Sequence, residues 1–130
     1  MRMRTGYLLL AILWGSLASP ATAEACTQWS AAGVYTVRQS NGFTVSLTVF
    51  QAGDALSGEA SYPGGSGVVE GWIKGPEFDF TIYWRNGARG SYNGFVDPAG
   101  AIVGGTTYDL DNRSSSATWA TKKRLRCVVD

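Results

Sequence analysis

The chain has 130 residues, with 11 basic and 10 acidic side chains, two cysteines and no histidine. This nearly neutral balance excludes the basic footprint that a nucleic-acid-binding protein needs to neutralise phosphates. The lack of histidine removes the side chain that most often serves as a general base or a metal ligand.

The first 23 residues have the pattern of a secretory signal peptide. Arg2 and Arg4 precede an apolar run from Tyr7 to Leu17, and a small-x-small cleavage site ends at Ala23. The apolar run is shorter than the roughly 20 residues that a membrane span requires, which disfavours an uncleaved anchor. We therefore predict a signal peptide at residues 1–23 and a secreted or periplasmic location.

The remaining segment, residues 24–130, is long enough for a single domain with a small hydrophobic core. Its two cysteines, Cys26 and Cys127, lie near its two ends and predict one disulfide in an exported chain. The alternative is a reactive or metal-binding pair, but no histidine is present to complete such a site. The basic cluster Lys122–Arg126 is interpreted as a solvated tail, with contact to an anionic surface as the alternative.

Beyond residue 24 no segment has helical periodicity, and short alternating runs are separated by turn residues at nearly regular intervals. Eight strands are predicted: Gly33–Gln39, Phe43–Phe50, Ala55–Tyr62, Gly67–Ile73, Phe78–Trp84, Gly90–Val96, Ala101–Tyr108 and Ala117–Thr121. All connections are short, so consecutive strands should pair antiparallel. The sequence predicts an all-β fold, an eight-stranded antiparallel up-and-down β-barrel, because closure removes exposed edges.

The strand Phe78–Trp84 alternates strictly between apolar and polar residues, which indicates one face on a core. Counting register from the turns places Phe80 opposite Gly71 and Gly94, where the glycines would leave room for the ring. The same count predicts an inward belt of Tyr35, Leu47, Gly58, Gly71, Phe80, Gly94, Gly104 and Thr121. On one side of the belt we expect an apolar plug, and on the other an open mouth.

Aromatic and polar side chains are predicted to gather at the mouth. Trp84, Tyr92, Tyr108 and Trp119 should converge there, with Thr106 also inward, and the longest loop, Asp109–Ser116, lies at the same end. Candidate ligand-binding residues are Trp84, Tyr92, Tyr108, Trp119, Tyr62, Gln39, Asn112 and Arg113. Such a set suits a small molecule or a sugar that stacks on a ring. Alternatively, the rings only fill the top of the barrel, since side chains can fill a barrel of eight strands.

No catalytic residue, metal ligand or cofactor site is predicted. The chain has no histidine and no nucleophile motif, which leaves carboxylates and tyrosines as acid–base candidates. Asp109 and Asp111 could serve a two-carboxylate hydrolase. A loop held by Asp–Arg contacts is the preferred interpretation, and the spacing of these residues is too short for a calcium loop.

Five short motifs resemble the avidin and streptavidin family of biotin-binding barrels, in order and in spacing. They are Gly33-Val34-Tyr35, Leu56-Ser57-Gly58, Phe80-Thr81-Ile82-Tyr83-Trp84, Tyr92-Asn93-Gly94 and Ala117-Thr118-Trp119. The resemblance implies a barrel with a pocket at its open end, with Trp84 as the best-matched wall residue and Tyr92 and Tyr108 as looser matches. Lipocalin-like barrels are a comparable architecture.

The sequence departs from that family where biotin would be held. Val37 and Ala60 occupy positions that look like the family's polar contacts to the ureido ring. The resemblance therefore argues against tight biotin binding.

The expected function is that of an exported, non-enzymatic binding module for a small or saccharide-like ligand. The alternative is a protein-binding module, such as an inhibitor of a secreted or host enzyme. It would act through loops 85–89 and 109–116 or through an outer face on which Trp72 and Tyr83 should be near neighbours beside Val68. That face could also support a homo-oligomer. No nucleic acid and no membrane span are expected.

Overall fold

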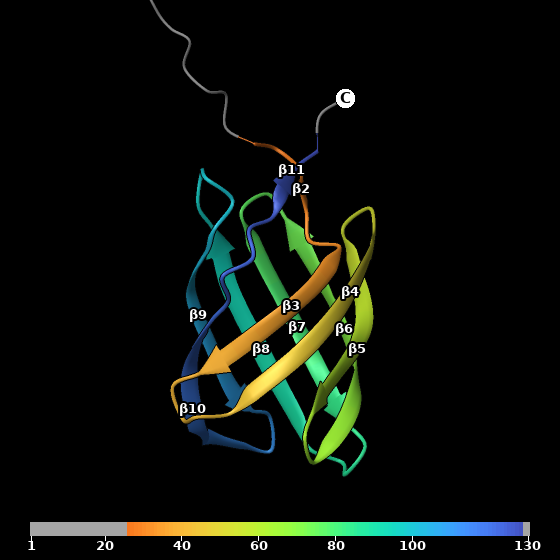
Figure 1. Ribbon diagram of the computed structural model, residues 1–130, viewed down its shortest axis with the longest axis vertical. Helices are drawn as coiled ribbons and strands as arrows, with labels where there is room; N and C mark the ends of the chain where they lie inside the picture. The colour runs from red at the N-terminus through yellow and green to blue at the C-terminus, as the bar shows by residue number, and fades with distance from the viewer. Residues whose placement is uncertain (1–25, 129–130) are drawn as a thin grey trace, which may run out of the picture.

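Eight strands close into an antiparallel barrel in a computed structural model, which describes residues 26–128. The strands are β3 (Gly33–Gln39), β4 (Thr44–Ala52), β5 (Ala55–Tyr62), β6 (Gly65–Lys74), β7 (Glu77–Trp84), β8 (Arg89–Val96), β9 (Ile102–Asp109) and β10 (Asn112–Ala120) (Figure 1). Each strand pairs with its neighbour in sequence, and β10 returns to β3. The predicted up-and-down barrel is confirmed. The predicted signal peptide, residues 1–23, lies outside the described residues.

Two short strands, β2 (Trp29–Ser30) and β11 (Arg126–Cys127), pair at one end of the barrel (Figure 1). The predicted disulfide joins Cys26 to Cys127 there, with their Cα atoms 5.8 Å apart. A disulfide is consistent with a non-cytoplasmic location. In residues 26–128 we find no helix of the length and apolarity that crossing a membrane demands.

The disulfide end of the barrel is closed by residues that the strand pattern did not predict. Trp29 and Leu125 are both buried, although neither belongs to one of the eight barrel strands. The backbone N–H of Leu125 donates to the carbonyl of Gly100 at 2.8 Å, which fixes the returning chain over the core. The apolar plug is therefore completed from outside the barrel.

The hairpin registers confirm part of the predicted belt and correct the rest. Phe80 lies opposite Gly71 as predicted, but its partner on β8 is Tyr92, and Gly94 lies opposite Phe78 instead. The predicted belt also placed Gly58 opposite Leu47 and Gly71, but its partners are Val49 and Val69. The strands run further into the turns than the count assumed, and tighter turns are favoured in hairpins. Each shortened turn shifts the register by two residues.

A β-bulge in β9 changes which side chains face the interior. Gly104 has a φ of +64°, and the β8–β9 register shifts beside it. Because a bulge adds one residue, the alternation inverts beyond it. Thr107 is buried and Thr106 is exposed, so the prediction that Thr106 and Tyr108 point inward is wrong.

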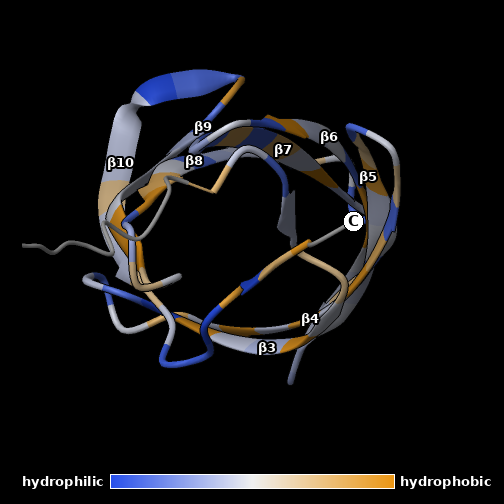
Figure 2. Cartoon of the chain, turned by 90° about the horizontal axis from the view of Figure 1, so that it is seen from above, coloured by the Kyte–Doolittle hydropathy of each residue, from blue (hydrophilic) through white to orange (hydrophobic). Residues whose placement is uncertain are grey.

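The longest predicted loop is mostly strand. Asp109 pairs with Asn112 across a two-residue turn, so the segment Asp109–Ser116 is a hairpin rather than a loop. Register shifts between Asn112 and Ser116, where β10 carries extra residues. The eight strands close into a ring, which is seen along its axis in Figure 2, and the β9–β10 hairpin, hydrophilic except at its tip, projects outside it.

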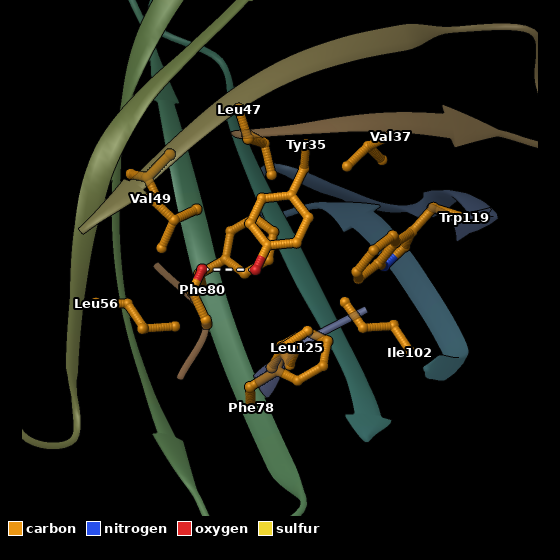
Figure 3. A pocket seen from close by; sticks show the side chains of 12 residues that line it. Tyr35, Val37, Leu47, Val49, Leu56, Phe78, Phe80, Ile102, Trp119 and Leu125 are labelled. Carbon is orange, nitrogen blue, oxygen red and sulfur yellow. Dashed lines mark hydrogen bonds between the residues drawn. The ribbon is translucent and has the colours of Figure 1, made fainter. Parts of the chain in front are cut away.

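Side chains fill the interior almost completely. One cavity of about 30 Å³ remains between the rings of Phe78, Phe80 and Trp119 and aliphatic side chains of β3, β4 and β5 (Figure 3). A space of that size holds about one water, and its lining is apolar. The Tyr35 hydroxyl donates to the carbonyl of Ala31 at 2.6 Å and leaves no free polar group there. The interior therefore has no room for a ligand.

Burial of Tyr35 predicts a loss of stability at high pH. Burial raises the pKa of this phenol from 10.0 to about 12. Between these values the unfolded chain has released a proton that the folded chain retains. The contribution of Tyr35 to the free energy of unfolding should therefore be constant below about pH 10 and fall as pH rises towards 12. Denaturant unfolding at stepped pH checks this. A Tyr35→Phe variant should lose part of the slope, and an equal slope in both proteins would contradict the assignment.

Candidate functional site at the mouth of the barrel

The end of the barrel opposite the disulfide carries a shallow hollow of about 260 Å³. The ends of β3, β7, β8, β9 and β10 surround it, together with the turn between β3 and β4. We call it the mouth hollow; its lining residues are Gln39, Asn41, Phe43, Trp84, Ala88, Arg89, Gly90, Tyr92, Thr107, Tyr108, Asp109, Ser115, Ser116 and Ala117. It is open to solvent, so a ligand there would be only partly enclosed.

One wall of the hollow is an aromatic cluster that holds Trp84. The ring of Tyr62 lies 5.0 Å from that of Trp84, edge to face, and 4.6 Å from that of Phe43. Phe43 also meets Trp84 edge to face at 6.3 Å. Such contacts fix ring orientation. Trp84 stays half-buried, and among the described residues its indole N–H has no hydrogen-bond acceptor.

The floor is a chain of polar groups that starts from a buried ring. Tyr92 stacks on Phe80, with ring centroids 5.1 Å apart, and its hydroxyl donates to Gln39 Oε1 at 2.6 Å. The Gln39 amide in turn donates to Asn41 Oδ1 at 3.2 Å. Burial raises the pKa of Tyr92, so this phenol stays protonated and acts as the hydrogen-bond donor to Gln39. Asn41 Oδ1 also accepts from the backbone N–H of Phe43 at 3.1 Å, so the oxygen of this amide is engaged twice and its nitrogen is the group left to donate.

The opposite rim carries charge. Arg89 pairs with Asp111 at 2.8 Å, and this contact raises the pKa of the arginine and lowers that of the carboxyl group. Asp109 accepts a hydrogen bond from the backbone N–H of Asp111 at 2.8 Å. The preferred interpretation of this segment, Asp–Arg contacts, is confirmed for Asp111, and its partner Arg89 comes from β8. Exposed pairs of this kind add little stability.

Four of the eight candidate residues line the mouth hollow: Gln39, Trp84, Tyr92 and Tyr108. The bulge turns Tyr108 towards the outer surface, where the Arg113 guanidinium lies 5.1 Å from its ring centroid. Tyr62 lies on the far side of Trp84, beside a second groove of about 380 Å³. Asn112 is exposed on the projecting hairpin.

Trp119 lies beneath the hollow rather than in it. Its side chain is buried against Phe80 and Tyr92, with ring centroids 6.2 and 6.0 Å away, and its indole N–H donates to the carbonyl of Thr106 at 3.0 Å. A Cβ at Gly105 would collide with the Trp119 ring, at 2.9 Å. The pair Gly104-Gly105 was thus the sequence signal for both the bulge and the seating of this tryptophan.

The outer face around Trp72 differs from the prediction. Trp72 is opposite Asp79, whereas Tyr83 is opposite Val68, four pairs further along the same hairpin. Glu70 and Thr81 lie between these two pairs. The two exposed aromatic residues therefore do not form one patch, although Tyr83 and Val68 are neighbours as expected.

Within residues 26–128, no group of three or more histidine, cysteine or carboxylate side chains is arranged to hold a metal ion. No family model, no curated protein and no solved structure matches the chain.

Proposed function

We propose that the protein is an exported, non-enzymatic binding module that takes one small polar ring, such as a sugar residue, in the mouth hollow. The observation that carries this proposal is the contrast between the filled interior and the mouth hollow, about 30 against about 260 Å³. A ligand has no access below Tyr92. It can only rest at the mouth with part of its surface in water.

The lining of the mouth hollow supports a sugar as the ligand class. The Trp84 ring offers a face against which the C–H groups of a pyranose can pack. Asn41 and Ser116 offer amide and hydroxyl groups on the other sides, and Arg89 adds a cation at the rim. Apolar surface with a few convergent polar groups is the usual composition of a small-ligand site. The open side suits the end residue of a longer saccharide.

Biotin is not proposed as the ligand. Val37 and Ala60, which stand at the polar positions of avidin-like barrels in the resemblance, are buried in the filled core. The barrel architecture is shared, but the interior that would hold a bicyclic ligand is occupied by Phe80 and Tyr92.

The proposal predicts that binding depends on Trp84. Titration with a panel of neutral mono- and oligosaccharides should change the intrinsic tryptophan fluorescence for at least one sugar. Trp84→Ala should weaken that binding at least about tenfold, as for a central aromatic contact.

Trp72→Ala is the matched control, because Trp72 is a partly exposed tryptophan on the outer face of the neighbouring strand. It should leave the affinity unchanged. Equal losses in the two variants, or no response to any saccharide on the panel, would refute the proposed site.

A further inference from the structure

The barrel is closed by a very short contact between its first and last strands. β3 and β10 share only the pairs Trp119↔Gln39 and Ala120↔Arg38, whereas β3 pairs with β4 at six positions. Beyond Ala120 the chain leaves the ladder and runs as irregular backbone towards β11 (Figure 1). We call the opening between β3 and residues 121–123 the β3–β10 seam.

Backbone hydrogen-bonding groups of β3 point into this seam. The N–H of Ser40 donates to the carbonyl of Thr118 on the β10 side, while the N–H of Gln39 donates to Phe43 on the β4 side. Because the direction alternates along a strand, the backbone groups of Val34 and Thr36 point towards the seam. Among the described residues they find no backbone partner in that direction. This is an edge strand within an otherwise closed barrel.

The seam opens onto a groove of about 410 Å³ lined by Val34, Thr36, Arg38, Ala120, Thr121, Lys122 and Lys123. Three of these residues are basic and none is acidic. No carboxylate within residues 26–128 forms an ion pair with any of the three. Val34 is 67% exposed, so the groove also has an apolar contact point. The Lys123 side chain lies beside Gly33, at the start of β3, with its Nζ 5.8 Å from the Tyr35 ring centroid.

We propose that the seam binds an extended acidic peptide segment of a partner protein, which adds as a strand to β3. Strand addition at an exposed edge satisfies backbone donors and acceptors and draws its affinity from main-chain hydrogen bonds. The peptide would bond to the backbone of Val34 and Thr36. Its acidic side chains would form ion pairs with Arg38 and Lys122. The Lys123 side chain would move away from the edge of β3 and also pair with an acidic side chain of the peptide. The excess of positive charge in the groove selects an acidic occupant.

The first test measures peptide binding by fluorescence polarisation. A labelled peptide of alternating glutamate and valine should bind saturably and more weakly as salt increases. The same peptide with N-methyl groups on alternate backbone nitrogens keeps its charge but cannot form a strand ladder, and it should not bind. Equal binding of the two peptides, or no binding of either, would overturn the proposal.

Charge reversal in the protein supplies the second test. Lys122→Glu combined with Lys123→Glu should weaken peptide binding at least about tenfold. Arg113→Glu is the control, because Arg113 is exposed on the projecting β9–β10 hairpin, and it should leave binding unchanged. Trp84→Ala should also leave peptide binding unchanged. A negative result for peptide binding at the seam can therefore be told apart from a negative result for saccharide binding in the mouth hollow. Equal effects of the seam and control variants would contradict the assignment.

Amide hydrogen exchange locates the peptide without relying on a substitution. In the free protein the Thr36 amide should exchange faster than that of Tyr35, which faces β4. The peptide should slow exchange at Val34 and Thr36 only. Protection that arises without peptide, together with a dimer in light scattering, would mean that a second copy fills the seam and would overturn the proposal.

Discussion

Replacement of Phe80 by alanine is expected to lower the free energy of unfolding by about 3–5 kcal/mol, the range for a buried phenylalanine. Phe80 is 6% exposed and stacks between Phe78 and Tyr92, with ring centroids 6.2 and 5.1 Å away. Its backbone lies so close to Gly71 that no side chain there could fill the space left by the ring. The cavity would therefore persist in the variant.

Equilibrium unfolding in guanidinium chloride measures this loss. Phe50→Ala is the matched control, since Phe50 is also on a central strand but is 58% exposed on the outer face. The control should cost well under about 1.5 kcal/mol. Similar losses in the two variants would mean that Phe80 is not the centre of the packed interior.

Removal of the disulfide is expected to cost about 4–5 kcal/mol in the chain-entropy model, because it closes a loop spanning 101 residues. β2 and β11 share only two residue pairs, and the disulfide is the covalent link between them. Trp29 in β2 and Leu125, which directly precedes β11, are the buried residues that close this end of the barrel. Fraying of this end would also expose the apolar cavity beneath. Stability should thus fall without any change to the eight-strand ladder.

The double variant Cys26→Ser, Cys127→Ser and the reduced wild-type protein should unfold at the same, lower denaturant concentration. Reductant should have no further effect on the variant. Far-ultraviolet circular dichroism should remain that of a β-barrel before unfolding begins. An unchanged unfolding midpoint after reduction would show that the terminal strands contribute little.

The fold was predictable because several levels of the sequence agree. Alternation in Glu77–Trp84, positive-φ glycines in the turns and two terminal cysteines each point to the same closed sheet. Gly42 and Gly87, which follow asparagines, adopt φ values of +90° and +94° as turns of this kind require. Local rules were sufficient for the topology.

Register was harder to predict because it depends on small differences in turn length. A turn shorter by two residues leaves the inward face unchanged but moves each partner along the strand. Phe80 thus kept its place against Gly71 and exchanged Gly94 for Tyr92. The burial of Trp29 and Leu125 had no periodic signal, because both lie outside the alternating strands.

The candidate site was only partly predictable for the same reason. Trp84 and Gln39 lie away from the bulge and line the mouth hollow. Tyr108 also lines it, but it follows the bulge at Gly104, so its side chain turns towards the outer surface instead of into the barrel. Asn41 was visible in the sequence as a turn residue but not as a member of the hydrogen-bond chain from Tyr92. That chain depends on how β3 and β8 are placed across the barrel.

The central claim is that recognition occurs at the mouth of a filled barrel, and the tryptophan indole N–H signals in NMR spectra test it most directly. Residues 26–128 contain Trp29, Trp72, Trp84 and Trp119, one in each distinct region of the molecule. A saccharide that binds should shift the Trp84 signal, leave those of Trp29 and Trp72 in place and affect Trp119 only weakly. A dominant shift at the buried Trp119, or at Trp72 on the outer face, would contradict the account.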